Sequence, residues 1–98
     1  MRYTYDAEAD ALYLYLAPDV RVVRQEEIGD VLVDFDSDGR PLGIEVLSPR
    51  TLRWDPEPVL AALTLDEADA ASVRFFAANQ SWAGKSAHTG GAGLLVPA

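Results

Sequence analysis

Two runs of alternating apolar residues, joined by a short turn, constrain the fold of this chain more than any other feature. The runs occupy residues 31–36 and 41–47, and their apolar members are Val31, Val33, Phe35, Leu42, Ile44 and Val46. A period of two is typical of a strand that buries one face. Between the runs, the segment 37–40 contains Asp38-Gly39, and glycine can adopt the positive φ that a tight turn requires. We therefore predict a β-hairpin whose two strands present their apolar sides to one core.

The residues that precede this hairpin predict three more strands. Residues 2–5 alternate, residues 11–17 place leucines and tyrosines on opposite sides, and residues 20–28 form a run that ends at the turn Gly29-Asp30. The pair Val22-Val23 breaks the alternation of the third run, which is typical of a bulge. The front half is thus predicted to be a five-strand antiparallel meander.

The second half of the chain has helical signals. Asp55 followed by Pro56 predicts the start of a helix over residues 56–63, and Thr64 with Glu67 has the spacing of a capping box that opens a helix over 65–79. The predicted buried stripe of the second helix is Leu65, Ala68, Ser72, Phe75 and Phe76. Trp54 and Trp82, which flank these helices, are interpreted as packing anchors. We predict a single α+β domain over residues 1–80.

Residues 81–98 are rich in Gly and Ala and are predicted to form an extended tail. Its apolar end, residues 94–96, gives a reason for the tail to pack against something, such as a neighbouring subunit.

Composition excludes several classes of function. The 98 residues include no cysteine, so disulfides and cysteine nucleophiles are absent. A formal net charge of −8 opposes binding to nucleic acid or to an anionic membrane, whereas it is compatible with a basic protein partner. No run approaches the about 18 apolar residues of a membrane span, and acidic residues precede the apolar run 11–17 where an export signal has positive charge. We expect a cytoplasmic protein.

The second predicted strand is apolar on both sides, and this predicts an interface. Its leucine side can meet the helices, whereas Tyr13 and Tyr15 on the other side need a separate cover. We predict that these tyrosines form the contact of a homodimer. The alternative is that the helices and the tail close over both sides of the sheet within one chain.

The front half resembles a known sequence family. The run from Tyr5 to Leu14 is similar to the opening of the small bacterial family named domain of unknown function 2283 (DUF2283), and the stretches 29–36, 38–40 and 43–47 resemble its second signature. The resemblance covers roughly residues 1–52. It implies a small β-rich domain and implies no established activity.

One acidic pattern has the spacing of a metal site. Asp34, Asp36, Asp38 and Glu45 match positions 1, 3, 5 and 12 of a calcium-binding EF-hand loop, with Gly39 at the turn. An EF-hand needs flanking helices, however, and the flanking segments alternate as strands. Pro41, at the eighth position, also lacks the N–H that the loop uses. A solvated acidic hairpin is therefore the preferred interpretation, with binding of Ca²⁺ or Mg²⁺ as the alternative.

Other candidate chemistry is weaker. Asp6, Glu8 and Asp10 form a second acidic cluster, which could join the hairpin carboxylates in a hydrolase only if folding placed both around one pocket. His88 is the only histidine and lies in the Gly-rich tail, so neither a multi-histidine metal site nor a positioned catalytic triad is predicted. No residue is assigned a catalytic role.

These observations lead to three functional hypotheses. The first is a non-enzymatic, dimeric protein-interaction module, antitoxin-like in kind, that binds a basic protein. The second is a divalent-metal-binding protein or metal-dependent hydrolase that uses the Asp34–Glu45 hairpin. The third is a small-ligand binder at a dimer seam near Tyr13 and Tyr15.

Overall fold

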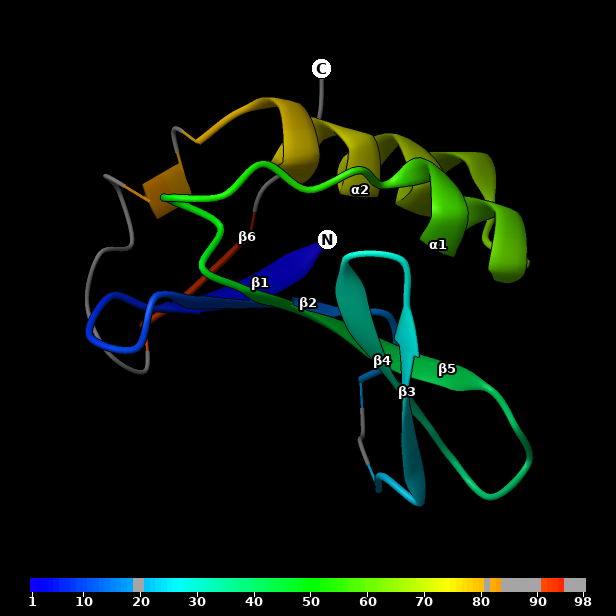
Figure 1. Cartoon of the computed structure of the whole chain (residues 1–98). Helices are drawn as coiled ribbons and strands as arrows, with labels where there is room; N and C mark the ends of the chain where they lie inside the picture. The colour runs from blue at the N-terminus through cyan, green and yellow to red at the C-terminus, as the bar shows by residue number, and fades with distance from the viewer. Residues whose placement is uncertain (19–20, 81, 84–90, 95–98) are drawn as a thin grey trace.

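A six-stranded antiparallel sheet with two helices on one of its faces makes up this chain (Figure 1). The computed structural model describes residues 1–18, 21–80, 82–83 and 91–94. The strands are β1 (Arg2–Asp6), β2 (Ala11–Tyr15), β3 (Arg24–Ile28), β4 (Val31–Phe35), β5 (Pro41–Leu47) and β6 (Gly91–Leu94), and the helices are α1 (Glu57–Ala62) and α2 (Glu67–Ala78). The predicted α+β class, with five antiparallel strands followed by two helices, is confirmed.

The strand order is β3-β4-β5-β2-β1-β6. Three neighbouring pairs, β1–β2, β3–β4 and β4–β5, are consecutive in the sequence, whereas the central pair β2–β5 joins distant segments. In that pair Leu14 lies opposite Ile44 and Tyr13 lies opposite Glu45. The β1–β2 hairpin and the three-strand unit β3-β4-β5 therefore meet at the β2–β5 pair, which joins the second and fifth predicted strands into one continuous sheet.

β6 lies within the segment that was predicted to be a tail. Its residues pair antiparallel with β1, with Leu94 opposite Arg2 and Gly91 opposite Tyr5. Glycine is depleted in strand interiors, so the sequence Gly-Ala-Gly-Leu carries no strand signal of its own. Part of the tail thus belongs to the sheet, and the predictions for 81, 84–90 and 95–98 lie outside the described residues.

The third strand is shorter than predicted. β3 begins at Arg24, not at residue 20, and residues 19–20 are outside the described ranges. The N–H of Val23 donates to the carbonyl of Phe35, which also lies opposite Arg24. The β3–β4 register is regular from Arg24 to Ile28, and the register shift of this sheet lies between Asp34 and Phe35 in the β4–β5 pair, so the bulge expected at Val22-Val23 stays a prediction.

The starts of both helices differ from the prediction. At α1 the N-cap is Pro56, not Asp55, and Asp55 accepts a hydrogen bond from the N–H of Glu57 from one residue farther upstream. At α2, the Asp66 carboxylate accepts from the N–H of Asp69 at 2.7 Å, so the predicted capping box at Thr64 is wrong. An ionised carboxylate is a stronger acceptor for an N-terminal N–H than a hydroxyl, and α2 starts correspondingly later.

The core lies between the helices and one face of the sheet. Aromatic contacts cross this layer: Tyr3 meets Phe76 at 5.2 Å between ring centroids, and Tyr5 meets Trp82 at 4.8 Å. Trp54 and Trp82 are both buried, which confirms their interpretation as packing anchors. The fully buried side chains of the sheet are Tyr5, Leu12, Leu14, Val31, Val33, Ile44 and Val46. Each such aliphatic side chain contributes roughly 1.5–3 kcal/mol of burial free energy.

The buried stripe of α2 is narrower than predicted. Ser72, Val73 and Phe76 are buried, Ala68 is exposed, and Leu65 and Phe75 are partly buried. Val73 was missing from the predicted stripe and replaces Ala68, because α2 meets the sheet through its second half.

Candidate functional site

The face of the sheet that points away from both helices is the candidate functional site (Figure 1). Strand alternation places on it the residues between the buried ones, and we call this set the open face: Arg2, Thr4, Tyr13, Tyr15, Gln25, Glu27, Leu32, Asp34, Gly43 and Glu45. Neither α1 nor α2 covers it. The predicted interface residues Tyr13 and Tyr15 lie at its centre and are partly buried.

Tyr13 and Asp34 form the polar centre of the open face. The Tyr13 hydroxyl donates to Asp34 Oδ2 at 2.8 Å, and Gln25 Nε2 donates to Asp34 Oδ1 at the same distance. Asp34 is only 7% exposed, and no basic side chain pairs with it within the described residues. Two neutral donors therefore hold a buried carboxylate in place.

This contact makes Tyr13 a poor acid or base at neutral pH. Burial, followed by the hydrogen bond to Asp34, raises the pKa of Tyr13 well above its usual value. The hydroxyl consequently stays protonated, and its proton is directed at Asp34. The arrangement fits an organised binding surface better than a nucleophile or general base.

Gly43 creates the space that Tyr13 occupies. Asp34 of β4 and Tyr15 of β2 are the strand neighbours of Gly43, and a Cβ atom built on it would overlap the Tyr13 ring. The φ of Gly43 is not in the left-handed region, so the requirement is close approach of the ring to the backbone. The position of the Tyr13 ring therefore depends on the absence of a side chain at Gly43.

Arg2 and Tyr15 extend the open face toward β1. The Arg2 guanidinium carbon lies 3.9 Å from the centroid of the Tyr15 ring, a cation–π contact. The Tyr15 ring meets the Tyr13 ring edge to face, at 4.8 Å between centroids and 63° between planes. Two aromatic rings and one guanidinium thus form a continuous patch.

The four residues of the predicted metal site occupy three different places. Asp36 closes the hairpin turn: its Oδ1 accepts from the N–H of Asp38 at 2.8 Å and of Arg40 at 2.9 Å. These backbone donors and the Arg40 guanidinium hold the pKa of Asp36 below its usual range. Asp38 is exposed at the turn, Asp34 points at Tyr13, and Glu45 lies opposite Leu32.

The structure therefore does not gather these carboxylates. Over the described ranges, no three Asp, Glu, His or Cys side chains are grouped so that they could hold a metal ion. Extended strands separate residues that an EF-hand would wrap around one ion. Metal binding stays a prediction that an ion titration tests.

The second acidic cluster organises a turn. Asp6 Oδ1 accepts from the N–H groups of Glu8 and Ala9, and Asp10 accepts from the Tyr5 hydroxyl at 2.7 Å. Burial and this contact raise the pKa of Tyr5. These carboxylates thus stabilise the β1–β2 connection. His88 lies outside the described residues.

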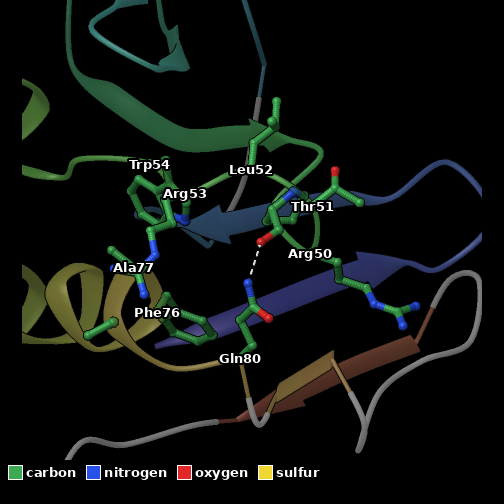
Figure 2. A pocket seen from close by; sticks show the side chains of 10 residues that line it. Arg50, Thr51, Leu52, Arg53, Trp54, Phe76, Ala77 and Gln80 are labelled. Atoms are coloured by element: carbon green, nitrogen blue, oxygen red, sulfur yellow. Dashed lines mark hydrogen bonds between the residues drawn. The ribbon is translucent and has the colours of Figure 1, made fainter.

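A separate hollow of about 560 Å³ lies between the 49–54 loop and the end of α2 (Figure 2). Gln80 Nε2 donates to the carbonyl of Pro49 at 2.8 Å and ties the two segments together. Figure 2 shows the side chains of Arg50 and Arg53 on opposite sides of Gln80, pointing away from each other. Because the two cations do not converge, this hollow has no organised anion site.

One structural finding bears on membranes. Within the ranges that the structure describes, neither helix has the length and apolar character needed to cross a bilayer.

Comparison with known proteins gives one match. The model of a family described as Protein of unknown function (DUF2283) matches residues 2–48, which include β1 to β5 and therefore the whole open face apart from the β6 edge. No curated protein and no solved structure matches the chain.

Proposed function

We propose a binding function for this chain, whose residues 2–48 belong to the DUF2283 family: it is a non-enzymatic protein-interaction module that binds a basic protein through the open face of its sheet. The observation that carries the proposal is the pair Tyr13 and Tyr15, half-buried on a face that neither helix covers. Tyrosine is enriched at protein interfaces because its ring adds apolar contact area and its hydroxyl is hydrated or bonded.

The charge of the open face supports a basic partner. Among the described residues that make up the open face, Glu27, Asp34 and Glu45 are acidic and Arg2 is the only basic one, and the chain as a whole has a net charge of −8. Several arginines already contact groups of the same chain, among them Arg2, Arg24, Arg40 and Arg74. The surplus negative charge favours and accelerates encounter with a positively charged protein. An antitoxin-like role, in which the partner is a basic toxin, is one form of this function.

A second copy of the chain is the competing occupant of the open face. Two stacked sheets would bury the tyrosines of both copies, as the sequence predicts for a homodimer. They would also bring Glu27 and Glu45 of both copies into one interface, and like charges oppose such contacts. For this reason we place the basic partner first and the homodimer second.

Affinity capture combined with light scattering tests the proposal. The tagged protein is incubated with lysate of its native host, and the same experiment is repeated with Tyr15→Ala and with Leu52→Ala. Leu52 is 63% exposed at the other hollow and is the matched control for loss of an exposed apolar side chain. We expect at least one captured protein of basic isoelectric point that the wild type and Leu52→Ala retain and Tyr15→Ala loses.

Two outcomes count against the proposal. Capture of nothing that depends on Tyr15 removes the basic-partner function. A light-scattering mass of twice the monomer that falls to the monomer mass in Tyr15→Ala assigns the open face to the homodimer instead.

The metal hypothesis has its own test. Titration of chelator-treated protein with Ca²⁺ or Mg²⁺ is compared with Asp38→Asn, since Asp38 is exposed and its side chain forms only a 3.8 Å contact with Arg40. Saturable binding that this variant abolishes would establish a metal site at the turn. Heat signals that do not saturate, or that the variant retains, would remove the hypothesis.

A further inference from the structure

A hollow on the open face has walls that suit one cationic side chain. It has a volume of about 560 Å³ and lies between β1, β2 and β5. Tyr13, Tyr15, Glu45, Thr4 and Asp6 contribute to its lining. Pockets of roughly 300–1,000 Å³ are the usual size for small ligands, so an extended side chain fits within it.

The aromatic walls of the hollow can hold a cation. Tyr13 and Tyr15 meet edge to face, with 63° between the ring planes, so the two rings form an aromatic corner. The chain itself shows what such a ring attracts, because the Arg2 guanidinium lies over the Tyr15 ring at 3.9 Å. The π-face of tyrosine carries partial negative charge, which is the reason for this contact.

The hollow also has a carboxylate that is available for an ion pair. Glu45 lies directly opposite Tyr13 on the neighbouring strand, and both side chains are partly buried. No ion pair or hydrogen bond engages the Glu45 side chain within the described residues. The second carboxylate, Asp6, accepts hydrogen bonds from the N–H groups of its own turn and adds negative charge at the rim.

We infer that this hollow is the specificity pocket of the interaction module and binds the guanidinium of an arginine side chain of the basic partner. A guanidinium is planar, so it can stack on one of the rings while its N–H groups donate to the Glu45 carboxylate. The inference rests on the proposed function and adds to it the residue type that the partner presents. Lysine has a compact ammonium that lacks the stacking face, and we expect it to bind less tightly.

Titration with short peptides tests this inference without the partner. ¹⁵N-labelled protein is titrated with a tri-arginine peptide, and tri-lysine and tri-citrulline peptides serve as comparisons. We expect saturable shifts confined to residues of β1, β2 and β5, with affinity in the order arginine, lysine, citrulline. Citrulline keeps the shape of the side chain and removes its charge, so it isolates the electrostatic contribution.

Charge-matched variants decide whether the hollow is responsible. Glu45→Gln and Glu27→Gln remove the same charge from the open face, but only Glu45 lines the hollow. We expect Glu45→Gln to weaken tri-arginine binding at least about fivefold, because Glu45 would contact the bound cation. Glu27→Gln should weaken it less than about twofold, because solvent and salt screen a charge that acts only at long range. Tyr15→Leu removes the ring and is expected to weaken binding as well, while the ¹⁵N spectrum verifies that each variant is folded.

Three results would overturn the inference. They are equal weakening by the two glutamine variants, tri-lysine binding as tight as tri-arginine, or shifts centred away from the hollow. The proposed function is tested separately: if Tyr15-dependent capture of a basic protein persists in Glu45→Gln, the interaction function stands and the inference about the pocket fails. If the tri-arginine peptide shifts the residues of the hollow but no protein is captured, the hollow binds arginine and the proposed function of binding a protein partner is wrong.

Discussion

The same strands present an apolar, buried side to the helices and a polar, partly exposed side to the open face. On β2, Leu12 and Leu14 are fully buried beneath the helices, whereas Tyr13 and Tyr15, which alternate with them, lie on the open face. The covered face is apolar and closed by aromatic contacts from β1 to Phe76 and Trp82. The open face instead combines rings, carboxylates and one guanidinium. The comparison indicates that one face supplies stability and the other is available for binding.

Truncation of the covered face should have the largest effect. Leu14→Ala removes a side chain that is 0% exposed, so we expect a loss of about 2–5 kcal/mol in the free energy of unfolding. Tyr15→Ala, one residue along the same strand, is expected to cost no more than about 1 kcal/mol, because it loses a partly exposed ring and a cation–π contact. Urea denaturation of both variants measures the difference. Equal losses would contradict the division between the faces.

Filling the space beneath Tyr13 should have the next largest effect. Gly43→Ala places a Cβ atom where the Tyr13 ring lies, and such overpacking costs about 1–3 kcal/mol. In a Tyr13→Ala background the ring is gone, and the same change is expected to cost much less. Thermal or urea unfolding of the two single variants and the double variant gives the coupling. An unchanged cost in that background would show that Gly43 is required for another reason.

Loss of the Tyr13 hydroxyl should have an intermediate effect that depends on pH. Tyr13→Phe leaves the buried Asp34 with one donor fewer, at a cost of about 1–2 kcal/mol at neutral pH. The pKa of Tyr13 is raised in the folded protein, so the unfolded chain loses this proton first. Stability that is fully present below about pH 10 should therefore decline as the pH rises further.

Comparison of wild type and Tyr13→Phe between pH 7 and pH 11 checks this sign. The variant should lose less stability over the alkaline range, since it lacks the titrating group. Tyr5 keeps the same direction of pKa shift in both proteins, so some alkaline loss is expected to persist. A parallel decline of the two proteins would contradict the assignment to Tyr13.

Loss of the exposed ion pair between α1 and α2 should have the smallest effect on stability. Arg74 of α2 donates to both oxygens of Glu57 of α1, at 3.0 and 3.1 Å, and both side chains are more than half exposed. Solvent and salt screen such pairs. Arg74→Gln is therefore expected to shift the unfolding temperature only slightly, and the shift should vanish in high salt. A large decrease in the unfolding temperature that does not depend on salt would show that Arg74 stabilises the fold through the packing of its side chain and not through the ion pair.

Local patterns explain why much of the fold was predictable. The hairpin of β4 and β5 follows from a period-two pattern on both sides of Asp38-Gly39, and its second strand has the predicted bounds, 41–47. The two-sided apolar character of residues 11–17 likewise predicted that Tyr13 and Tyr15 lie on the side of the strand that the leucines and the helices leave uncovered. Both signals belong to neighbouring residues, so no knowledge of distant contacts was needed.

The candidate site itself depends on contacts between distant residues. Asp34 was a candidate metal ligand in the alternative interpretation of the acidic hairpin, and in the structure it accepts a hydrogen bond from Tyr13, which is 21 positions away in the sequence. Gly43 had no predicted role, although its missing side chain makes room for Tyr13. Nothing near these residues in the sequence signals such pairings, because they arise only when β2 lies beside β5 and β5 beside β4.

The sequence by itself therefore determined that five strands and two helices form within residues 1–80, which side of most of them is apolar, and that the chain carries an excess of negative charge. Only the tertiary structure decided that β2 pairs with β5, that β6 adds to the sheet edge, and that the acidic hairpin residues separate. The physical reason is the range of the interactions. Periodicity and turn chemistry act within a few residues, whereas strand order and the pairing of Tyr13 with Asp34 follow from packing and hydrogen bonds across the whole domain.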